Sequence, residues 1–368
     1  MANYKHYVVT TRQVIALGGN PPLFNYKYEK QYTSSDYAES FLRFGRYQVK
    51  ENIKKETVFY DPLFFNNTVN NQDEDDHFEG LTDKTLIDIS RTESGAGSEL
   101  FFNTLFDELD TSKKDLLIFL FGFHNSVRKE LKHMNLLHKR FCTETSPIGS
   151  ILMISWPSQG LTGYNEEMNT DVDNTGRALA IFFLKLSVII EKRRQKNQFI
   201  PRINFMPQSM GHRIVNSMMN LLMKQNQSMY SKVRGLFNRL ILMSPDIEAN
   251  ELSIDSTGSY KHVPELGNIT YVFYSTEDPI LKMKFKNKRM GLIGPTAVPN
   301  NIRVCRVIQY GQPPLFELGQ TKRHRFFEFD LGFIELLQKI FSGRDDEYGD
   351  NFSFKIKWND FDTNKPDE

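Results

Sequence analysis

The sequence predicts an α/β protein built on a mostly parallel, doubly wound sheet. From about residue 100 onward, short apolar runs alternate with turns and with longer segments of helical periodicity. This alternation is typical of parallel strands joined by helices that cover both faces of a sheet. The candidate strands are the runs at 116–121, 150–155, 203–206, 239–243, 269–274 and 302–308.

Three segments around these runs carry the clearest helical patterns. Residues 174–196 form a long apolar segment that ends in cationic residues, which suit the end of a helix, and Asn174 is the expected cap. Residues 211–226 place their apolar side chains on one side of a helix, so the methionines there are expected to pack in the core. Residues 333–341 give a third, shorter helical pattern.

The two ends of the chain differ from this central part. The first hundred residues contain strand-like runs at 6–17 and 57–61 without a regular alternation of strand and helix. We therefore expect a β-rich N-terminal extension (1–84), an α/β core (85–341) and a charged C-terminal tail (342–368). Within the tail, the stretch FSFKIKW is a candidate terminal strand.

Composition limits the function classes that need to be considered. The 368 residues are 39% hydrophobic and carry a formal net charge of +1, so we expect a globular protein with no overall field for nucleic acid. The only two cysteines, Cys142 and Cys305, lie outside any paired spacing. No apolar stretch predicts a membrane span or a secretion signal. We expect a cytoplasmic protein without a metal or an organic cofactor.

A serine stands between a predicted strand and a predicted helix in the stretch INFMPQSMGHRIV (203–215). A nucleophilic serine at such a place needs a sharp turn with small neighbours, so that its Oγ is exposed and the backbone can turn. Gly211 matches the second glycine of the G-x-S-x-G pattern, whereas Pro207 takes the place of the first. Proline is tolerated there if it ends the strand. Ser209 is thus a candidate nucleophile, with a helix N-cap as the alternative.

The candidate partners follow Ser209 in the order acid, then histidine, which is the order found in hydrolases with such a turn. Asp278 lies directly after the run 269–274, and Asp246 occupies the equivalent place one strand earlier. Each aspartate also suits a structural turn, so both remain candidates for the acid. His324 is the one histidine of eight that follows Asp278, and its place between a strand and a helical segment suits a general base.

An oxyanion hole needs two backbone N–H groups aimed at the developing negative charge. Met210, the residue after the candidate nucleophile, would supply one of them. The second would come from the segment after the strand 116–121, where Gly122 lets the backbone come close and Phe123 carries the amide. Gly122 also fits the simple end of a strand.

Several motifs that appear in the same order resemble a bacterial α/β-hydrolase family of largely unassigned function. Members of that family carry a His-Gly-Phe-Asn loop, a Ser-Trp-Pro-Ser strand end and a His-Ser-Met-Gly elbow. The similarity covers about residues 85 to 340. The matching stretches are FLFGFHNSVRKEL, ILMISWPSQGLTGYNEEMNTDVDNTGRAL, INFMPQSMGHRIVNSMM, LILMSPDIEANEL and YVFYSTEDPILK.

The resemblance implies an α/β-hydrolase fold in which Ser209 is the nucleophile, Asp278 the preferred acid and His324 the base. Family members also carry an aspartate after Ser-Pro or Ala-Pro, which matches Asp246 and keeps the choice of acid open.

Two departures from the family pattern change the lining of the expected site without removing a member of the triad. Phe121 and Gln208 stand where the family has histidines, before the loop glycine and before the serine. Further lining candidates are Trp156 and Tyr164, although Trp156 fits a core residue equally well.

The expected activity is that of a serine hydrolase acting by acyl transfer on a small ester-like or short lipid substrate. The alternative is a non-catalytic protein of the same fold that binds a partner, because the departures at Phe121 and Pro207 alter the loop and the elbow. The sequence names no protein partner.

Overall fold

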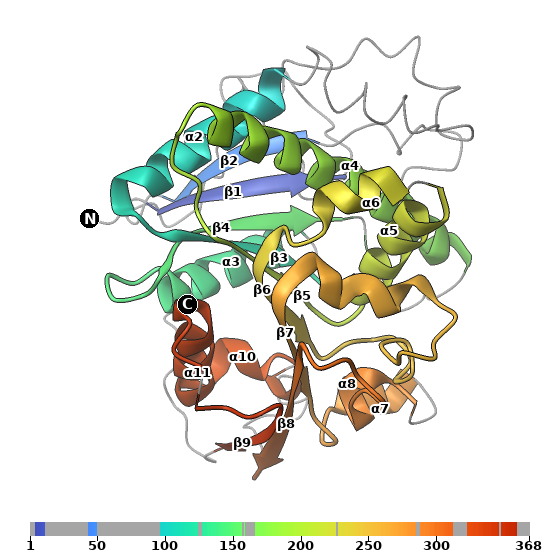
Figure 1. Cartoon of the computed structure of the whole chain (residues 1–368). Helices are drawn as coiled ribbons and strands as arrows, with labels where there is room; N and C mark the ends of the chain where they lie inside the picture. The colour runs from blue at the N-terminus through green and yellow to red at the C-terminus, as the bar shows by residue number, and fades with distance from the viewer. Residues whose placement is uncertain are drawn as a thin grey trace.

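The computed structural model describes residues 4–11, 43–49, 96–123, 127–156, 158, 166–225, 227–284, 288–311, 322–345 and 347–358. The strands in these ranges form one nine-stranded sheet in the order β2-β1-β4-β3-β5-β6-β7-β8-β9, with helices on both faces (Figure 1). All neighbouring strands in it are parallel except β1 and β2. The expectation of a mostly parallel, doubly wound α/β sheet is confirmed.

Each of the six strands expected from the apolar runs is present. Their bounds are β3 Asp115–Leu120, β4 Ile148–Ser155, β5 Ile203–Pro207, β6 Phe237–Met243, β7 Gly267–Tyr274 and β8 Ile302–Tyr310. Central strands such as β3 are buried along their whole length, which is why they read as continuous apolar runs rather than as alternating ones.

The ends of the chain contribute three further strands to the same sheet. β1 (Tyr4–Thr10) pairs in parallel with β4, and β2 (Arg43–Val49) pairs with β1 in the antiparallel direction. β9 (Asn351–Lys357) pairs in parallel with β8, which confirms the expected terminal strand. The strand-like run at 57–61 lies outside the described residues. The boundaries after residues 84 and 341 stay predictions.

Helices connect the strands, and one of them begins earlier than expected. The predicted cap Asn174 is wrong, because this residue lies inside a 30-residue helix that begins at Glu166. The expected cationic end, Lys192 to Arg194, is present in its last turn. The helices are α2 Ala96–Ser112, α3 Val127–Phe141, α4 Glu166–Gln195, α5 Gly211–Gln225, α6 Gln227–Val233, α7 Pro279–Lys284, α8 Met290–Ile293, α10 Phe326–Phe329 and α11 Leu331–Ser342, with a 3₁₀ helix, η4, at Ser259–Leu266.

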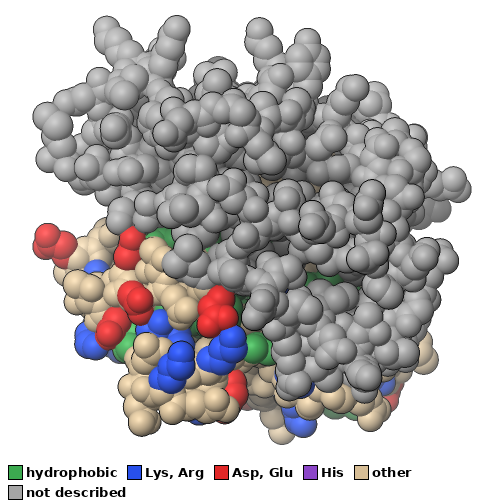
Figure 2. All heavy atoms as spheres, turned by 90° about the horizontal axis from the view of Figure 1, so that it is seen from above, with side chains coloured by type: hydrophobic (Ala, Val, Ile, Leu, Met, Phe, Trp, Pro, Cys, Tyr) green, Lys and Arg blue, Asp and Glu red, His purple; other side chains and the backbone are tan. Residues whose placement is uncertain are grey.

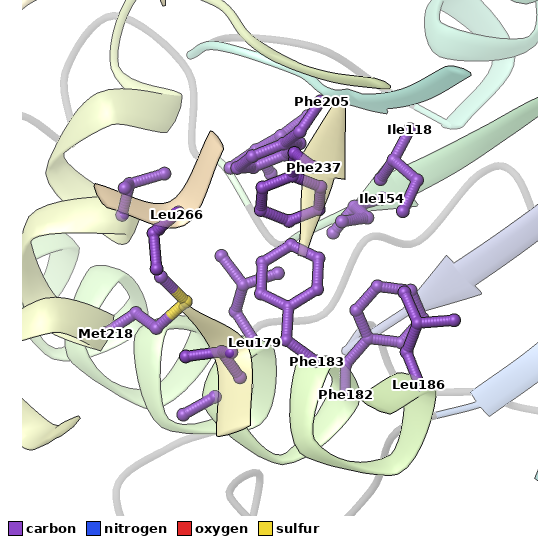
Figure 3. Close-up of a cluster of buried hydrophobic side chains, with 14 of the residues drawn as sticks. Ile118, Ile154, Leu179, Phe182, Phe183, Leu186, Phe205, Met218, Phe237 and Leu266 are labelled. Atoms are coloured by element: carbon purple, nitrogen blue, oxygen red, sulfur yellow. The ribbon is translucent and has the colours of Figure 1, made fainter. Parts of the chain in front are cut away.

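The sheet separates two apolar cores. Alternate residues of β3 point to opposite faces: Ile118 belongs to the core under α2, α4 and α5, and Phe119 to the core under α3 and α11. Figure 3 shows the first core, where Phe183 of α4 lies beside Phe205 and Phe237 of the sheet. The methionines of α5 pack in this core, as expected. The sheet is thus held on both sides and forms a rigid support for the loops at its edge.

One described part of the surface carries charges of both signs close together. Figure 2 shows basic and acidic side chains interspersed on the described part of one face. Among the described helices, none has the length and apolar character needed to cross a membrane.

Candidate active site

The predicted site residues lie beyond the carboxyl ends of four parallel strands. Gly122 follows β3, Ser209 follows β5, Asp278 follows β7 and His324 comes after β8. In parallel sheets, ligands bind outside the carboxyl ends of the strands, and these four residues all lie beyond such ends. The topology therefore gathers residues that are up to about 200 positions apart in the chain.

Ser209 occupies a strained turn between β5 and α5, and residues 207–211 of this turn are called the elbow below. Its φ is +52°, in the left-handed region that non-glycine residues seldom adopt. The turn is fixed because the Ser209 N–H donates to Met243 O at 3.0 Å, and the Ser209 carbonyl accepts the Asp246 N–H at 3.2 Å. A helix N-cap has extended backbone angles, so the N-cap alternative is wrong. Pro207 is the last residue of the strand, a place where its missing N–H is tolerated.

Two glycines allow the loop after β3 to lie directly against this turn. A Cβ added at Gly122 would lie 2.6 Å from Gln208 Oε1 and 2.8 Å from Ser209 Cβ. One added at Gly211 would lie 3.1 Å from Phe121 O. A side chain at Gly122 would thus collide with the elbow, and at Gly211 it would crowd the loop. These close contacts explain both glycines better than the end of a strand does.

Asp278 and His324 form a hydrogen-bonded pair. His324 Nδ1 donates to Asp278 Oδ2 at 2.6 Å, and both side chains are buried. The other carboxylate oxygen accepts the N–H groups of Ile280 and Leu281 at 3.0 and 3.1 Å, in the first turn of α7. Asp278 is therefore held rigidly, and it fixes the imidazole with Nδ1 protonated and Nε2 as the hydrogen-bond acceptor.

Asp246, the other candidate acid, has different partners. Its carboxylate forms ion pairs with Arg213 at 3.2 Å and with Arg289 at 3.3 Å. Its backbone N–H binds the Ser209 carbonyl, as described above. Asp246 thus supports the elbow through its backbone. The carboxylate that binds His324 is that of Asp278 rather than Asp246.

Gln208 joins the histidine to the loop after β3. Its Oε1 accepts the Gly122 N–H at 3.1 Å, which assigns the opposite end of the amide as the NH₂ group. That NH₂ group donates to His324 Nε2 at 3.0 Å. Among the described residues, none hydrogen-bonds to Ser209 Oγ. The sequence singled out Gln208 as a lining residue but gave no sign of this bridge.

The two candidate oxyanion donors, Met210 and Phe123, directly follow Ser209 and Gly122 in the chain. Met210 is buried, and its backbone N–H has no acceptor among the residues that the structure describes. Phe123 directly follows Gly122 and is partly buried against the core. Both amides therefore belong to the backbone segments that Gly122 and Gly211 bring into contact.

Trp156 takes the core position that the sequence offered as the alternative to lining the site. Its side chain is fully buried, and Nε1 donates to Phe121 O at 2.8 Å. It therefore supports the loop that carries Gly122 from the inside. Tyr164, the other lining candidate, lies outside the described residues.

A buried ionic cluster that the sequence analysis missed lies directly after His324. Arg325 Nε donates to Glu328 Oε1 at 2.8 Å, and His133 Nδ1 donates to Glu328 Oε2 at 2.9 Å. Burial alone would raise the pKa of Glu328, but Arg325 and His133 hold it below its ordinary value. The Arg325 guanidinium also lies 5.9 Å from the centre of the Phe121 ring. The cluster thus ties the His324 segment to α3, and its sequence signal was the Arg-x-x-Glu spacing.

No metal site accompanies this arrangement in the described ranges, where no three His, Cys, Asp or Glu side chains are grouped to hold an ion.

The comparison with protein families agrees with the resemblance seen in the sequence. A family model described as "Alpha/beta hydrolase of unknown function (DUF900)" matches residues 100–307, which include β3 to β7, the elbow and Asp278. A solved structure described as "Crystal structure of ESTFA (FE-lacking apo form)" is 13% identical with a TM-score of 0.29, over 62% of this chain and 74% of that one. No curated protein matches.

Proposed function

Because the chain belongs to the family of α/β hydrolases of unknown function, we propose that it is a serine hydrolase that acts by acyl transfer on a small ester-like or short lipid substrate. The observation that carries this proposal is the buried pair of His324 and Asp278. The pair lies beyond the carboxyl ends of the same parallel strands as Ser209, whose φ is +52°. A pure binding scaffold has no need to keep both a strained serine and such a pair beyond the carboxyl ends of the same sheet.

In the proposed reaction, His324 Nε2 takes the proton of Ser209 while Oγ attacks the substrate carbonyl carbon. Asp278 stabilises the imidazolium that forms, and the amides of Met210 and Phe123 hold the oxyanion. The imidazolium then gives its proton to the leaving group as the carbon–oxygen bond breaks, which leaves an acyl-enzyme. Water, activated by the same histidine, releases the acid and restores Ser209.

The test is intact-protein mass after incubation with a fluorophosphonate, comparing wild type with Ser209→Ala. We expect one adduct on the wild type and none on the variant. Ser244→Ala is the matched control, because Ser244 is also buried, has a φ of +44° and follows the next strand, yet it takes no part in the hydrogen bonds of Asp278 and His324. Its adduct should form as in the wild type. An adduct that survives Ser209→Ala would refute Ser209 as the nucleophile.

The alternative is a non-catalytic, partner-binding protein of this fold. One observation favours it: the Gln208 amide already occupies His324 Nε2, the atom that a general base must offer to the serine. A folded protein that forms no adduct at Ser209, even after Gln208 is replaced, would support this alternative.

A further inference from the structure

The Gln208 side chain binds one atom that the proposed reaction needs, His324 Nε2, and a neighbour of the proposed oxyanion donor Phe123. A neutral imidazole nitrogen has one lone pair, so His324 Nε2 cannot accept a proton from Ser209 while it accepts the Gln208 N–H at 3.0 Å. The Oε1 atom of the same amide accepts the Gly122 N–H at 3.1 Å, on the loop that carries the proposed oxyanion donor. One carboxamide thus links the proposed base, His324, to the loop after β3 that carries Gly122 and Phe123.

The position of this carboxamide resembles that of a substrate acyl group. A scissile group places its carbonyl oxygen at backbone N–H donors and its leaving atom at the histidine. Gln208 presents a carbonyl oxygen to a loop N–H and a nitrogen to His324 Nε2, in the same relative order. The chain therefore fills this space with a side chain of its own.

The backbone of Gln208 is fixed, so only its side chain is free to leave. The Gln208 N–H donates to Leu120 O at 3.0 Å, and the residue bridges to Met243 on the other side. The side chain is almost fully buried, with 3% of the residue exposed. Rotation about its side-chain torsions would break the hydrogen bonds to His324 Nε2 and to the Gly122 N–H together.

We propose that Gln208 is an autoinhibitory residue: its carboxamide closes the resting site, and a substrate whose acyl carbonyl binds the loop displaces it. This inference rests on the proposed function, since it concerns access to the same serine and histidine. The predicted ligand class is a carbonyl compound that offers an acceptor to the loop amides in place of Oε1. A reagent without an acceptor oxygen should not open the site.

The experiment compares rates of fluorophosphonate labelling at Ser209 in wild type, Gln208→Met and Gln208→Ala. Methionine keeps the length of the side chain but removes both hydrogen bonds. The loss of two buried hydrogen bonds, each of ordinary net strength, should accelerate labelling by roughly 10- to 30-fold in both variants. Gln338→Met is the control: Gln338 is a partly buried glutamine of α11 that donates to the Arg140 carbonyl at 2.7 Å and takes no part in the hydrogen bonds of Gln208 and His324. It should give no acceleration.

Thermal unfolding first shows which variants fold, and the labelling rates are compared among those. Faster labelling of both Gln208 variants supports the proposal, and so does an adduct that appears only when Gln208 is replaced. Wild-type labelling at Ser209 with no faster labelling of either variant overturns the autoinhibitory role and leaves the hydrolase intact. Acceleration in Gln208→Ala alone also overturns it, because bulk rather than hydrogen bonding would then block the serine. The absence of any adduct in all folded variants refutes both proposals.

Discussion

The exchange Asp278→Asn tests the proposed acid with little change of shape. The oxygen of the new amide can still accept the N–H groups of Ile280 and Leu281, which now bind Oδ1 at 3.0 and 3.1 Å. The NH₂ group then faces His324 Nδ1 in place of the carboxylate oxygen, which is 2.6 Å away in the wild type. Because two donors cannot pair, the imidazole must move its proton to Nε2. It then has no lone pair to offer to Ser209.

The size of the effect follows from this change of tautomer. In serine hydrolases with an equivalent aspartate, the exchange to asparagine lowers the rate by about 10⁴-fold while the geometry is kept. We expect a loss of this order in the rate of fluorophosphonate labelling. The charge-assisted hydrogen bond itself is also lost, so the free energy of unfolding should fall by about 1.5–3 kcal/mol. The variant should remain folded because the backbone contacts of Asp278 survive.

The assay measures labelling rates and thermal unfolding for Asp278→Asn and for the control Asp246→Asn. Asp246 binds two arginines rather than His324, so its exchange should lower stability and slow labelling far less. The reasoning fails if Asp278→Asn labels at the wild-type rate. It fails equally if Asp246→Asn is the variant that loses labelling, since Asp246 would then be the acid.

Three further predictions concern stability. Ser209→Gly should be more stable than Ser209→Ala by about 0.5–1 kcal/mol in urea unfolding, because a φ of +52° strains every residue except glycine; equal stabilities would contradict the strain. Burial lowers the pKa of His212 from 6.5 to about 3. Between these values the unfolded imidazole binds a proton that the folded one does not, so stability is lost as the pH falls, at about 1.4 kcal/mol per unit. The slope of unfolding free energy against pH from 6 to 4 should be flatter in His212→Asn, and an unchanged slope would exclude this cause. Arg325→Met leaves Glu328 buried without its main partner and should cost about 3–5 kcal/mol, whereas Arg325→Met with Glu328→Gln should recover part of that loss in the same urea assay.

The sequence predicted the sheet well because its strands are buried on both faces. A strand such as β3 has no exposed position, so it appears as an uninterrupted apolar run. The start of α4 was missed because its first two turns are rich in polar residues, and an apolar pattern begins only near Asn174. Periodicity detects the part of a helix that faces the core, not the part that precedes it.

The choice between the two candidate acids needed the order of the strands. Asp246 and Asp278 both follow a strand end, and nothing in the local sequence separates them. In the sheet, β6 adjoins β5, so Asp246 lies under the serine turn. β7 adjoins β8, the strand that precedes His324, so Asp278 reaches the histidine. The acid therefore depends on which strand neighbours the histidine, and that is a property of the topology.

The contacts that position the site could not be predicted because they join residues far apart in the chain. Trp156 binds the Phe121 carbonyl across 35 positions, and Gln208 binds His324 across 116. Trp156 was equally suited to the core and to a pocket until its hydrogen-bond partner was known. A polar side chain beside a candidate nucleophile indicates a site, but it does not tell whether that side chain serves the substrate or closes the site.

The two departures from the family motifs share one physical property. Phe121 and Gln208 replace histidines with side chains that do not titrate, on the two segments that meet at Gly122. The Phe121 ring lies beside the buried Arg325 guanidinium, where an imidazolium would meet a like charge. The Gln208 amide touches His324 Nε2, where a second imidazole would compete for the same proton. With Phe121 and Gln208 at these two positions, Asp278 is still the carboxylate bound to His324, so the exchanges leave the pairing of the histidine intact.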